Sequence, residues 1–292
     1  MALRIERSAL LGPSGFEPVK RNDLEVLEID LLLEGIYQQY GFDFRDYARG
    51  SIKRRLWRRV YAEGLESISG LQERVLHDQN TMNRLLEDLS INVTSMFRDP
   101  EFYTAIRQKI IPLLRTYPFI RIWNAGCSTG EETYSLAILL REEGLIDKTK
   151  IYATDINETV LDLAKQGVFP LDKMRDYTEN YIAAGGQTAF SEYYTANGKG
   201  ARFNESLTEN IIFAQHNLAS DRSFNEFQMI ICRNVMIYFD RSLQERVHSL
   251  FYSSLGMSGF LALGRKESIK FTRHAAAYEE IDLNEKLYKR VR

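Results

Sequence analysis

A short segment with two glycines has the residue types and the position of a ligand-binding loop. Gly126 and Gly130 lie in Ala125–Gly130, between a run predicted as a strand and a run predicted as a helix. In α/β proteins this turn borders the crevice where ligands bind. A dinucleotide-binding loop reads GxGxxG and offers a bare helix N-terminus to a pyrophosphate, whereas this helix begins with Glu131 and Glu132, which would repel phosphate. The loop therefore favours a cationic ligand or a nucleoside without phosphate.

Asp155 supplies a second group for such a ligand. It ends the next predicted strand, where a carboxylate can accept hydrogen bonds from the hydroxyls of a ribose. S-adenosylmethionine has a free ribose, no phosphate, and an ammonium group that suits an acidic partner. A purely structural interpretation is also open. In that interpretation Glu131 and Glu132 stabilise the first turn of their helix, and Asp155 caps the helix that follows it.

The composition is that of an ordinary globular protein. The chain has 292 residues, a formal net charge of −2 and 44% hydrophobic residues, which excludes a disordered chain and a global attraction to nucleic acid. No apolar run is long enough to span a membrane and residues 1–23 lack a signal-peptide core, so we expect a cytoplasmic protein without membrane insertion. Cys127 and Cys232 lack metal-ligand spacing, so we expect two buried thiols, no disulfide and no metal.

The hydrophobic pattern divides the chain into three regions. Residues 22–90 have helical spacing, which predicts a small all-helical N-terminal domain. Its apolar positions include Leu27, Leu31, Leu32 and Ile36. Residues 91–118 connect it to residues 119–292, where short apolar runs alternate with helical runs and predict an α/β fold with a parallel sheet. At about 172–211, aromatic-rich runs flank Asn197-Gly198 and predict a small antiparallel β insertion.

Four segments together resemble the chemotaxis receptor methyltransferases, the CheR family. They are Asn92–Asp99, Trp123–Glu132, Ala153–Ile156 and Cys232–Phe239, and the similarity extends from about residue 25 to 288. The resemblance implies a doubly wound, Rossmann-like methyltransferase domain after the helical domain, with residues 91–118 as linker and cofactor lid. It also implies methyl transfer from S-adenosylmethionine to glutamate side chains of chemoreceptors, which gives glutamate methyl esters and S-adenosylhomocysteine and serves sensory adaptation.

Site residues follow from the resemblance, motif by motif. The cofactor-binding residues that it implies are Asn92, Thr94, Arg98, Gly126, Glu132, Asp155, Asn217, Leu218, Arg233 and Asn234. Asp155 would hold the ribose, and Asn217 with Leu218 would hold the adenine. Arg98 and Tyr238 are the predicted catalytic residues, because they could orient the incoming carboxylate. A glutamate is ionised at pH 7, so its attack needs no general base. Arg98 could alternatively only close over the cofactor.

The sequence departs from the family pattern at a few positions. Met96 stands where the family usually has Phe, and Thr133 where it usually has Pro. Both replacements preserve the local character, so we expect the cofactor site to tolerate them. Arg265-Lys266 replaces a common His-Ser pair. These two cations are expected near the mouth of the site, where they would affect substrate recognition.

A basic run, Arg49–Arg59, has one apolar face. Ile52, Leu56 and Val60 recur at helical spacing and should pack inward, with the pairs Arg54/Arg58 and Arg55/Arg59 outward. Such a run is commonly just a solvated face. The family resemblance implies instead that it docks on the acidic cytoplasmic helical bundle of a chemoreceptor. The residues predicted to dock are Lys53, Arg54, Arg55, Arg58 and Arg59.

Other functions remain possible from the sequence alone. A nucleic-acid methyltransferase would use the basic helix to bind phosphates, but it usually has an Asn/Asp-Pro-Pro-aromatic run where this chain has Cys232-Arg-Asn-Val. A module that binds S-adenosylmethionine without catalysis is a third possibility, and a dehydrogenase conflicts with the acidic helix start. We expect a monomer that acts on a chemoreceptor and does not bind nucleic acid.

Overall fold

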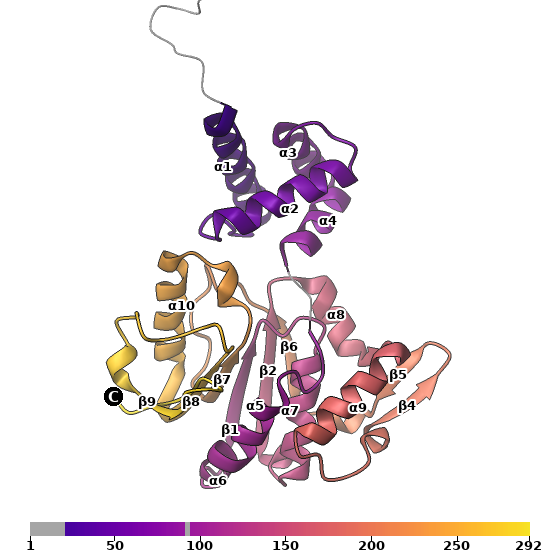
Figure 1. The fold of residues 1–292 in the computed structure, drawn as a ribbon, viewed down its shortest axis with the longest axis vertical. Helices are drawn as coiled ribbons and strands as arrows, with labels where there is room; N and C mark the ends of the chain where they lie inside the picture. Colours follow the sequence, from indigo (N-terminus) through magenta and orange to yellow (C-terminus); the bar gives the residue numbers. More distant parts are fainter. Residues whose placement is uncertain (1–20, 91–93) are drawn as a thin grey trace, which may run out of the picture.

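The computed structural model describes residues 21–90 and 94–292 (Figure 1). The first part is a domain of four helices: α1 (Arg21–Tyr40), α2 (Arg49–Ala62), α3 (Ile68–His77) and α4 (Gln79–Leu89). Their apolar faces form one core, which confirms the predicted helical domain. Leu27 and Leu31 are 47% and 51% exposed, contrary to their place in the predicted apolar spacing. They face solvent because Leu32 and Ile36, on the opposite side of α1, occupy the core.

The second part is built on a seven-stranded sheet, counted over the described residues. Its order is β6-β2-β1-β7-β8-β10-β9, and the pairs among the first five strands are parallel while β10 pairs antiparallel with β8 and β9. The strands are β1 (Ile120–Ala125), β2 (Thr149–Asp155), β6 (Ile211–Gln215), β7 (Phe227–Cys232), β8 (Leu255–Leu263), β9 (Tyr278–Asp282) and β10 (Leu287–Arg290). This is the predicted doubly wound α/β architecture.

Both faces of the sheet are covered by helices. The main ones are α7 (Glu131–Glu142), α8 (Glu158–Gln166) and α10 (Arg241–Ser254). Successive side chains of β1 enter different cores: Ile122 packs in one core with Leu136 of α7, and Trp123 packs in the other with Phe251 of α10. A strand buried on both faces has a continuous apolar run, and this explains the unbroken runs in the sequence.

Residues 94–118, predicted as a linker, contain further helices. They are α5 (Pro100–Ala105), a π-helical turn η1 (Ile106–Ile110) and α6 (Ile111–Leu114). Phe97 and Met96 are fully buried in the same core as α7. Short 3₁₀ turns occur at Ile146–Lys148 (η2), Leu171–Lys173 (η3), Phe190–Tyr193 (η4), Glu205–Leu207 (η5), Met236–Tyr238 (η6) and Ala275–Ala277 (η7).

A small antiparallel sheet lies between α8 and β6 in the chain. Its order is β3-β5-β4, with β3 (Val168–Phe169), β4 (Tyr194–Asn197) and β5 (Gly200–Phe203), and α9 (Met174–Ala183) precedes the hairpin. Asn197 pairs with Gly200, so the predicted hairpin is confirmed. β3 begins before the predicted start of the insertion.

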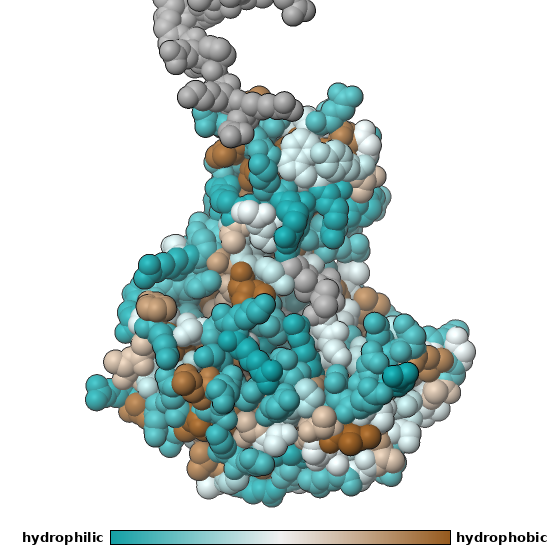
Figure 2. All heavy atoms as spheres, viewed as in Figure 1, coloured by the Kyte–Doolittle hydropathy of each residue, from teal (hydrophilic) through white to brown (hydrophobic). Residues whose placement is uncertain are grey.

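The four-helix domain lies beyond the carboxyl ends of the central strands (Figure 1). Direct contacts join the two parts: the backbone N–H of Ala48, which precedes α2, donates to the Tyr238 carbonyl at 2.8 Å, and Tyr47 forms an isolated bridge with Phe239. Figure 2 shows a narrower region between the two parts, with polar side chains over most of the visible face. Among the helices described, none is both long and apolar enough to cross a membrane.

Candidate active site

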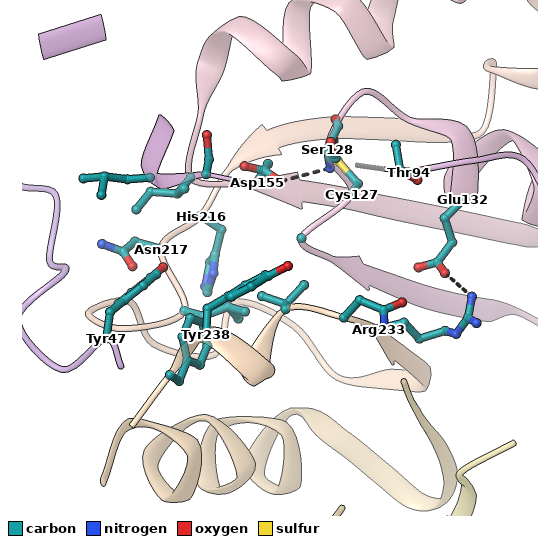
Figure 3. Close-up of a pocket in the computed structure, with 18 of the residues that line it drawn as sticks. Tyr47, Thr94, Cys127, Ser128, Glu132, Asp155, His216, Asn217, Arg233 and Tyr238 are labelled. Carbon is teal, nitrogen blue, oxygen red and sulfur yellow. Dashed lines mark hydrogen bonds and ion pairs between the residues drawn. The ribbon is translucent and has the colours of Figure 1, made fainter. Parts of the chain in front are cut away.

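A pocket lies at the carboxyl edge of the parallel strands (Figure 3), and Tyr47 and Leu89 of the helical domain also line it. Its wall brings together every predicted cofactor and catalytic residue that the structure describes: Thr94, Arg98, Gly126, Glu132, Asp155, Asn217, Leu218, Arg233, Asn234 and Tyr238. Asn92 lies outside the described residues. This convergence follows from the topology, because the carboxyl ends of parallel strands meet at one edge of the sheet.

The glycine loop has a backbone that only glycine allows at its first position. Gly126 has φ +78°, and a Cβ there would lie 2.4 Å from Cγ2 of Val235. The N–H groups of Gly126 and Cys127 both donate to the Thr154 carbonyl, at 2.8 and 2.9 Å. The loop is therefore fixed to the end of β2, and its backbone forms part of the pocket wall.

Asp155 is 9% exposed and organises the loop as well as the pocket. Its Oδ2 accepts the Ser128 N–H at 2.9 Å, and its Oδ1 accepts the Asn157 N–H at 3.0 Å. Burial raises the pKa of this carboxyl above its ordinary value. The N-cap of α8 is Asn157, whose side chain accepts the Thr159 N–H, so Asp155 is not that cap. Each carboxylate oxygen retains acceptor capacity for a ligand hydroxyl.

The two glutamates that begin α7 have different environments. Glu132 lines the pocket, and its oxygens accept from Asn124 Nδ2 at 2.7 Å and from Arg233 Nη1 at 2.8 Å (Figure 3). Glu131 is buried instead, hydrogen-bonded by the hydroxyls of Thr129 and Tyr177, and burial raises its pKa. The structural interpretation therefore applies to Glu131, whereas Glu132 is the acidic group that a ligand can reach.

Arg233 is a buried cation in the pocket wall. Its side chain is 2% exposed, it pairs with Glu132, and its Nη2 donates to Asp99 Oδ2 at 2.5 Å. The guanidinium also lies 4.0 Å from the ring centroid of Phe102. Because its charge is balanced on both sides, Arg233 fixes Glu132 rather than adding a net charge to the pocket.

The turn after β7 is held by a distant carboxylate. Asn234 has φ +61°, and Glu267 accepts the N–H groups of Asn234, Val235 and Met236 at 3.1, 3.0 and 2.8 Å. Glu267 also accepts the Gly264 N–H at 2.6 Å. Burial raises the pKa of Glu267. This carboxylate therefore determines where Asn234 and the following η6 turn stand in the pocket.

The loop after β6 forms another side of the pocket. Asn217 is 9% exposed; its Oδ1 accepts the Ala219 N–H at 2.9 Å, while its buried Nδ2 has no hydrogen-bond partner among the described residues. His216 Nε2 lies 3.2 Å from the Arg222 carbonyl, and its ring packs edge-on against Trp123. The unpaired amide of Asn217 is a donor that a bound base could satisfy.

Several pocket residues were not predicted: Tyr47, Cys127, Ser128, His216 and Val235. Cys127 and Ser128 belong to the predicted loop, and His216 precedes Asn217, so their positions in the motifs could have indicated them. Tyr47 comes from the helical domain and had no such signal. Both cysteines are buried and free, as predicted, and burial raises their thiol pKa values well above the ordinary range.

The basic helix α2 differs from the prediction. Ile52, Leu56 and Val60 are buried as expected, and Lys53, Arg54 and Arg58 are exposed. The outward prediction is wrong for Arg55, which is 5% exposed, and for Arg59, whose side chain is 13% exposed. The physical reason is the carboxyl end of α4, which supplies the Asp88 carboxylate and unpaired carbonyls as acceptors inside the domain.

Arg265 is also held within the protein. Its Nη2 donates to Glu285 at 2.8 Å and to Glu101 at 3.0 Å, and neither Arg265 nor Lys266 lines the pocket. Among the described residues, no group of three or more His, Cys, Asp or Glu side chains could hold a metal.

The pocket fits S-adenosylmethionine. Asp155 has acceptors for a ribose, Asn217 has an unpaired buried donor, Glu132 is an acidic partner for an ammonium group, and the acidic start of α7 disfavours a pyrophosphate. The fold and the site thus define an S-adenosylmethionine-dependent methyltransferase.

The comparisons with known proteins give the family. Residues 27–90 match the all-alpha domain of the CheR methyltransferases, and residues 92–286 match their S-adenosylmethionine-binding domain. The chain therefore belongs to the CheR methyltransferase family, whose activity is S-adenosylmethionine-dependent methylation of chemoreceptors.

Relatives with similar sequences support this membership. One is described as "Putative methyltransferase Cher3" from Pseudomonas putida and is 50% identical over 90% of this chain and 97% of its own length. Chemotaxis protein methyltransferase 2 of Pseudomonas aeruginosa is 32% identical over 82% of this chain and 86% of its own. The chemotaxis protein methyltransferase of Borreliella burgdorferi is 29% identical, over 83% and 88% respectively.

Proposed function

We propose that the acceptor is a glutamate carboxylate on the cytoplasmic helical bundle of a chemoreceptor and that the product is a glutamate methyl ester. The observation that carries this proposal is the composition of one pocket wall. Arg98 and Tyr238, which suit a carboxylate, line the same pocket as Asp155 and Glu132, which suit the cofactor.

The chemistry needs alignment more than it needs an acid or a base. S-adenosylmethionine supplies a methyl group on a positively charged sulfur. Because a glutamate has a reference pKa near 4.3, its carboxylate is already nucleophilic at pH 7. Arg98 attracts the carboxylate, and the Tyr238 hydroxyl donates one hydrogen bond that orients it. Positioning of this kind can lower a barrier by about 7 to 11 kcal/mol.

The pocket residues are arranged for positioning. Glu132 accepts hydrogen bonds from Arg233 and Asn124, so its charge is held in place next to the cofactor. The His216 ring contacts the Arg222 carbonyl through Nε2 and packs against Trp123, and its Nδ1 is buried without a hydrogen-bond partner among the described residues. An ionised glutamate needs no base, so the proposed reaction assigns this nitrogen no proton transfer.

The helical domain is the proposed receptor-docking domain. Of the residues predicted to dock, Lys53, Arg54 and Arg58 are exposed on α2, and they remain the candidates for docking on an acidic helical bundle. Lys53 pairs with Glu25 at 2.6 Å, and Arg58 pairs with Asp88 at the carboxyl end of α4. In both pairs the cation is more exposed than its acidic partner, so the cationic end faces solvent. The protein would work as a cytoplasmic monomer beside the receptor.

The experiment is transfer of labelled methyl groups to membranes that contain candidate chemoreceptors. A methyl ester loses its label as volatile methanol after brief treatment with alkali, whereas methylated lysine, arginine or a nucleobase retains it. Arg98→Ala should still bind the cofactor but form much less ester. Arg175→Ala, on the exposed side of α9, is the matched control. Alkali-stable label on nucleic acid would overturn the proposal, and cofactor binding without any transfer would favour a non-catalytic module.

A further inference from the structure

Arg55 differs from the other cations of α2 in its burial. It is 5% exposed and lies on the same side of the helix as Ile52 and Leu56, which are fully buried. Within the described part of the chain no carboxylate forms an ion pair with it. A buried arginine without a carboxylate partner is expensive, so its other contacts must compensate for the lost hydration.

The first of these contacts is with the carboxyl end of α4. Nη1 of Arg55 donates to the Leu89 carbonyl and, at 3.4 Å, approaches the Asp88 carbonyl. Carbonyls in the last turn of a helix have no partner within the helix and carry its negative dipole end, so a cation there is favourable. Leu89 and Ser90 also line the pocket, and Arg55 therefore fixes one part of its rim.

The second contact is with the ring of Tyr238. The guanidinium carbon of Arg55 lies 4.9 Å from the ring centroid, in a buried environment where a cation–π interaction is strongest. The start of α2 holds the same residue through its backbone, because the Ala48 N–H donates to the Tyr238 carbonyl at 2.8 Å. Figure 3 shows the Tyr238 side chain extending into the pocket. α2 thus holds both the ring and the backbone of Tyr238.

We propose that Arg55 is a positioning residue for methyl transfer: from the helical domain it holds the ring of Tyr238 and the carboxyl end of α4, and so places the Tyr238 hydroxyl in the pocket. This inference rests on the proposed function only in the role of Tyr238 beside the acceptor. Arg55 does not line the pocket itself, so its removal should act on the rate of transfer and not on cofactor affinity.

The test compares two neighbouring arginines of α2. Arg55→Met keeps the length of the side chain but removes the charge, and Arg55→Lys restores a charge. Arg54→Met makes the same change at an exposed position. For each variant we would measure cofactor Kd by calorimetry, kcat and KM with receptor membranes, and the ¹⁹F resonance of fluorotyrosine placed at position 238.

Arg55→Met should lower kcat by about 10-fold with little change in cofactor Kd, and Arg55→Lys should recover part of the loss. Arg54→Met should raise KM for the receptor instead. The ¹⁹F resonance should shift in Arg55→Met and not in Arg54→Met. In a Tyr238→Leu background, Arg55→Met should lose most of its effect on kcat, because the two residues act through one contact.

Three results would overturn the inference: an unmoved ¹⁹F resonance in Arg55→Met, an unchanged kcat, or the same loss of kcat with and without the Tyr238 ring. If Arg55→Met does not fold, the kcat and ¹⁹F signal of Arg55→Lys decide the question. A wild type that labels no receptor would overturn the proposed function, and the ¹⁹F comparison would still decide whether Arg55 positions Tyr238.

Discussion

Replacing Asp155 with asparagine should weaken binding of S-adenosylmethionine and S-adenosylhomocysteine without unfolding the protein. The carboxylate is 9% exposed and already accepts the N–H groups of Ser128 and Asn157. Asparagine keeps one acceptor oxygen, but its amide points N–H groups at a site that accepted hydrogen bonds. Loss of charge-assisted hydrogen bonds to the ribose costs about 1.5 to 3 kcal/mol, which is about 10- to 150-fold in affinity.

The change in the free energy of unfolding should be smaller, because two effects oppose each other. Asp155→Asn loses one backbone hydrogen bond, but it also removes a buried charge whose desolvation raises the carboxyl pKa. Calorimetry with both ligands measures the affinity, and thermal unfolding of the ligand-free protein measures the stability. Asp162→Asn is the matched control, since Asp162 lies on α8 and pairs with Lys165 at the surface. Wild-type affinity in a folded Asp155→Asn variant would refute the ribose assignment.

The same residue gives the affinity a predictable dependence on pH. The folded-state pKa of Asp155 is raised by burial, so the proton returns at a higher pH than in the unfolded chain. Ligand affinity should therefore fall as the pH falls through this raised pKa, because a protonated carboxyl accepts fewer hydrogen bonds. The stability of the ligand-free protein should change with pH in the opposite direction. Protonation of Asp155 favours the folded state, and this contribution to stability is lost as the pH rises through the folded-state pKa. Asp155→Asn should abolish both dependences.

Further predictions concern the rest of the site and the docking face. Reversal of charge at Lys53, Arg54 and Arg58 should raise KM for the receptor at unchanged cofactor Kd. Each ion pair lost should weaken the free energy of receptor binding by about 0.2 to 1 kcal/mol, with a smaller effect at high salt. A change in KM that does not depend on salt would argue against docking. Gly126→Ala should reduce cofactor affinity, because its Cβ would lie 2.4 Å from Val235, whereas Gly198→Ala, with nothing within 4 Å, should bind normally in the same calorimetric assay. Glu267→Gln should lower both kcat and the midpoint of thermal unfolding. The reason is that an amide cannot accept hydrogen bonds from all four N–H groups that the carboxylate now binds, those of Asn234, Val235, Met236 and Gly264. A normal kcat would show that this carboxylate does not determine the position of the turn.

The sequence was most informative where chemistry follows from topology. Gly126 and Asp155 each follow a predicted strand, and parallel strands must bring their carboxyl ends to one edge, so their proximity could be inferred. The different environments of Glu131 and Glu132 could not be inferred from the sequence. Adjacent residues at the start of a helix point in different directions, and which one reaches the pocket depends on Tyr177, far away in the chain. Glu267 is another example, since its contacts with Asn234 and Met236 require a left-handed residue after β7 that no local pattern indicates.

The basic helix α2 shows how far charge patterns alone can be interpreted. The prediction of outward arginines followed from helical spacing, which turned only the apolar positions inward. The structure supplies partners for arginines inside the domain, because α4 ends against α2: Arg55 and Arg59 contact carbonyls of α4, and Asp88 accepts from Arg58 and Arg59. The last carbonyls of a helix accept hydrogen bonds whatever residues they belong to, so residue types in the sequence do not reveal this acceptor. Consequently α2 has two distinct faces, and receptor docking on the exposed one and the contact with Tyr238 on the buried one can be separated by single substitutions at Arg54 and Arg55.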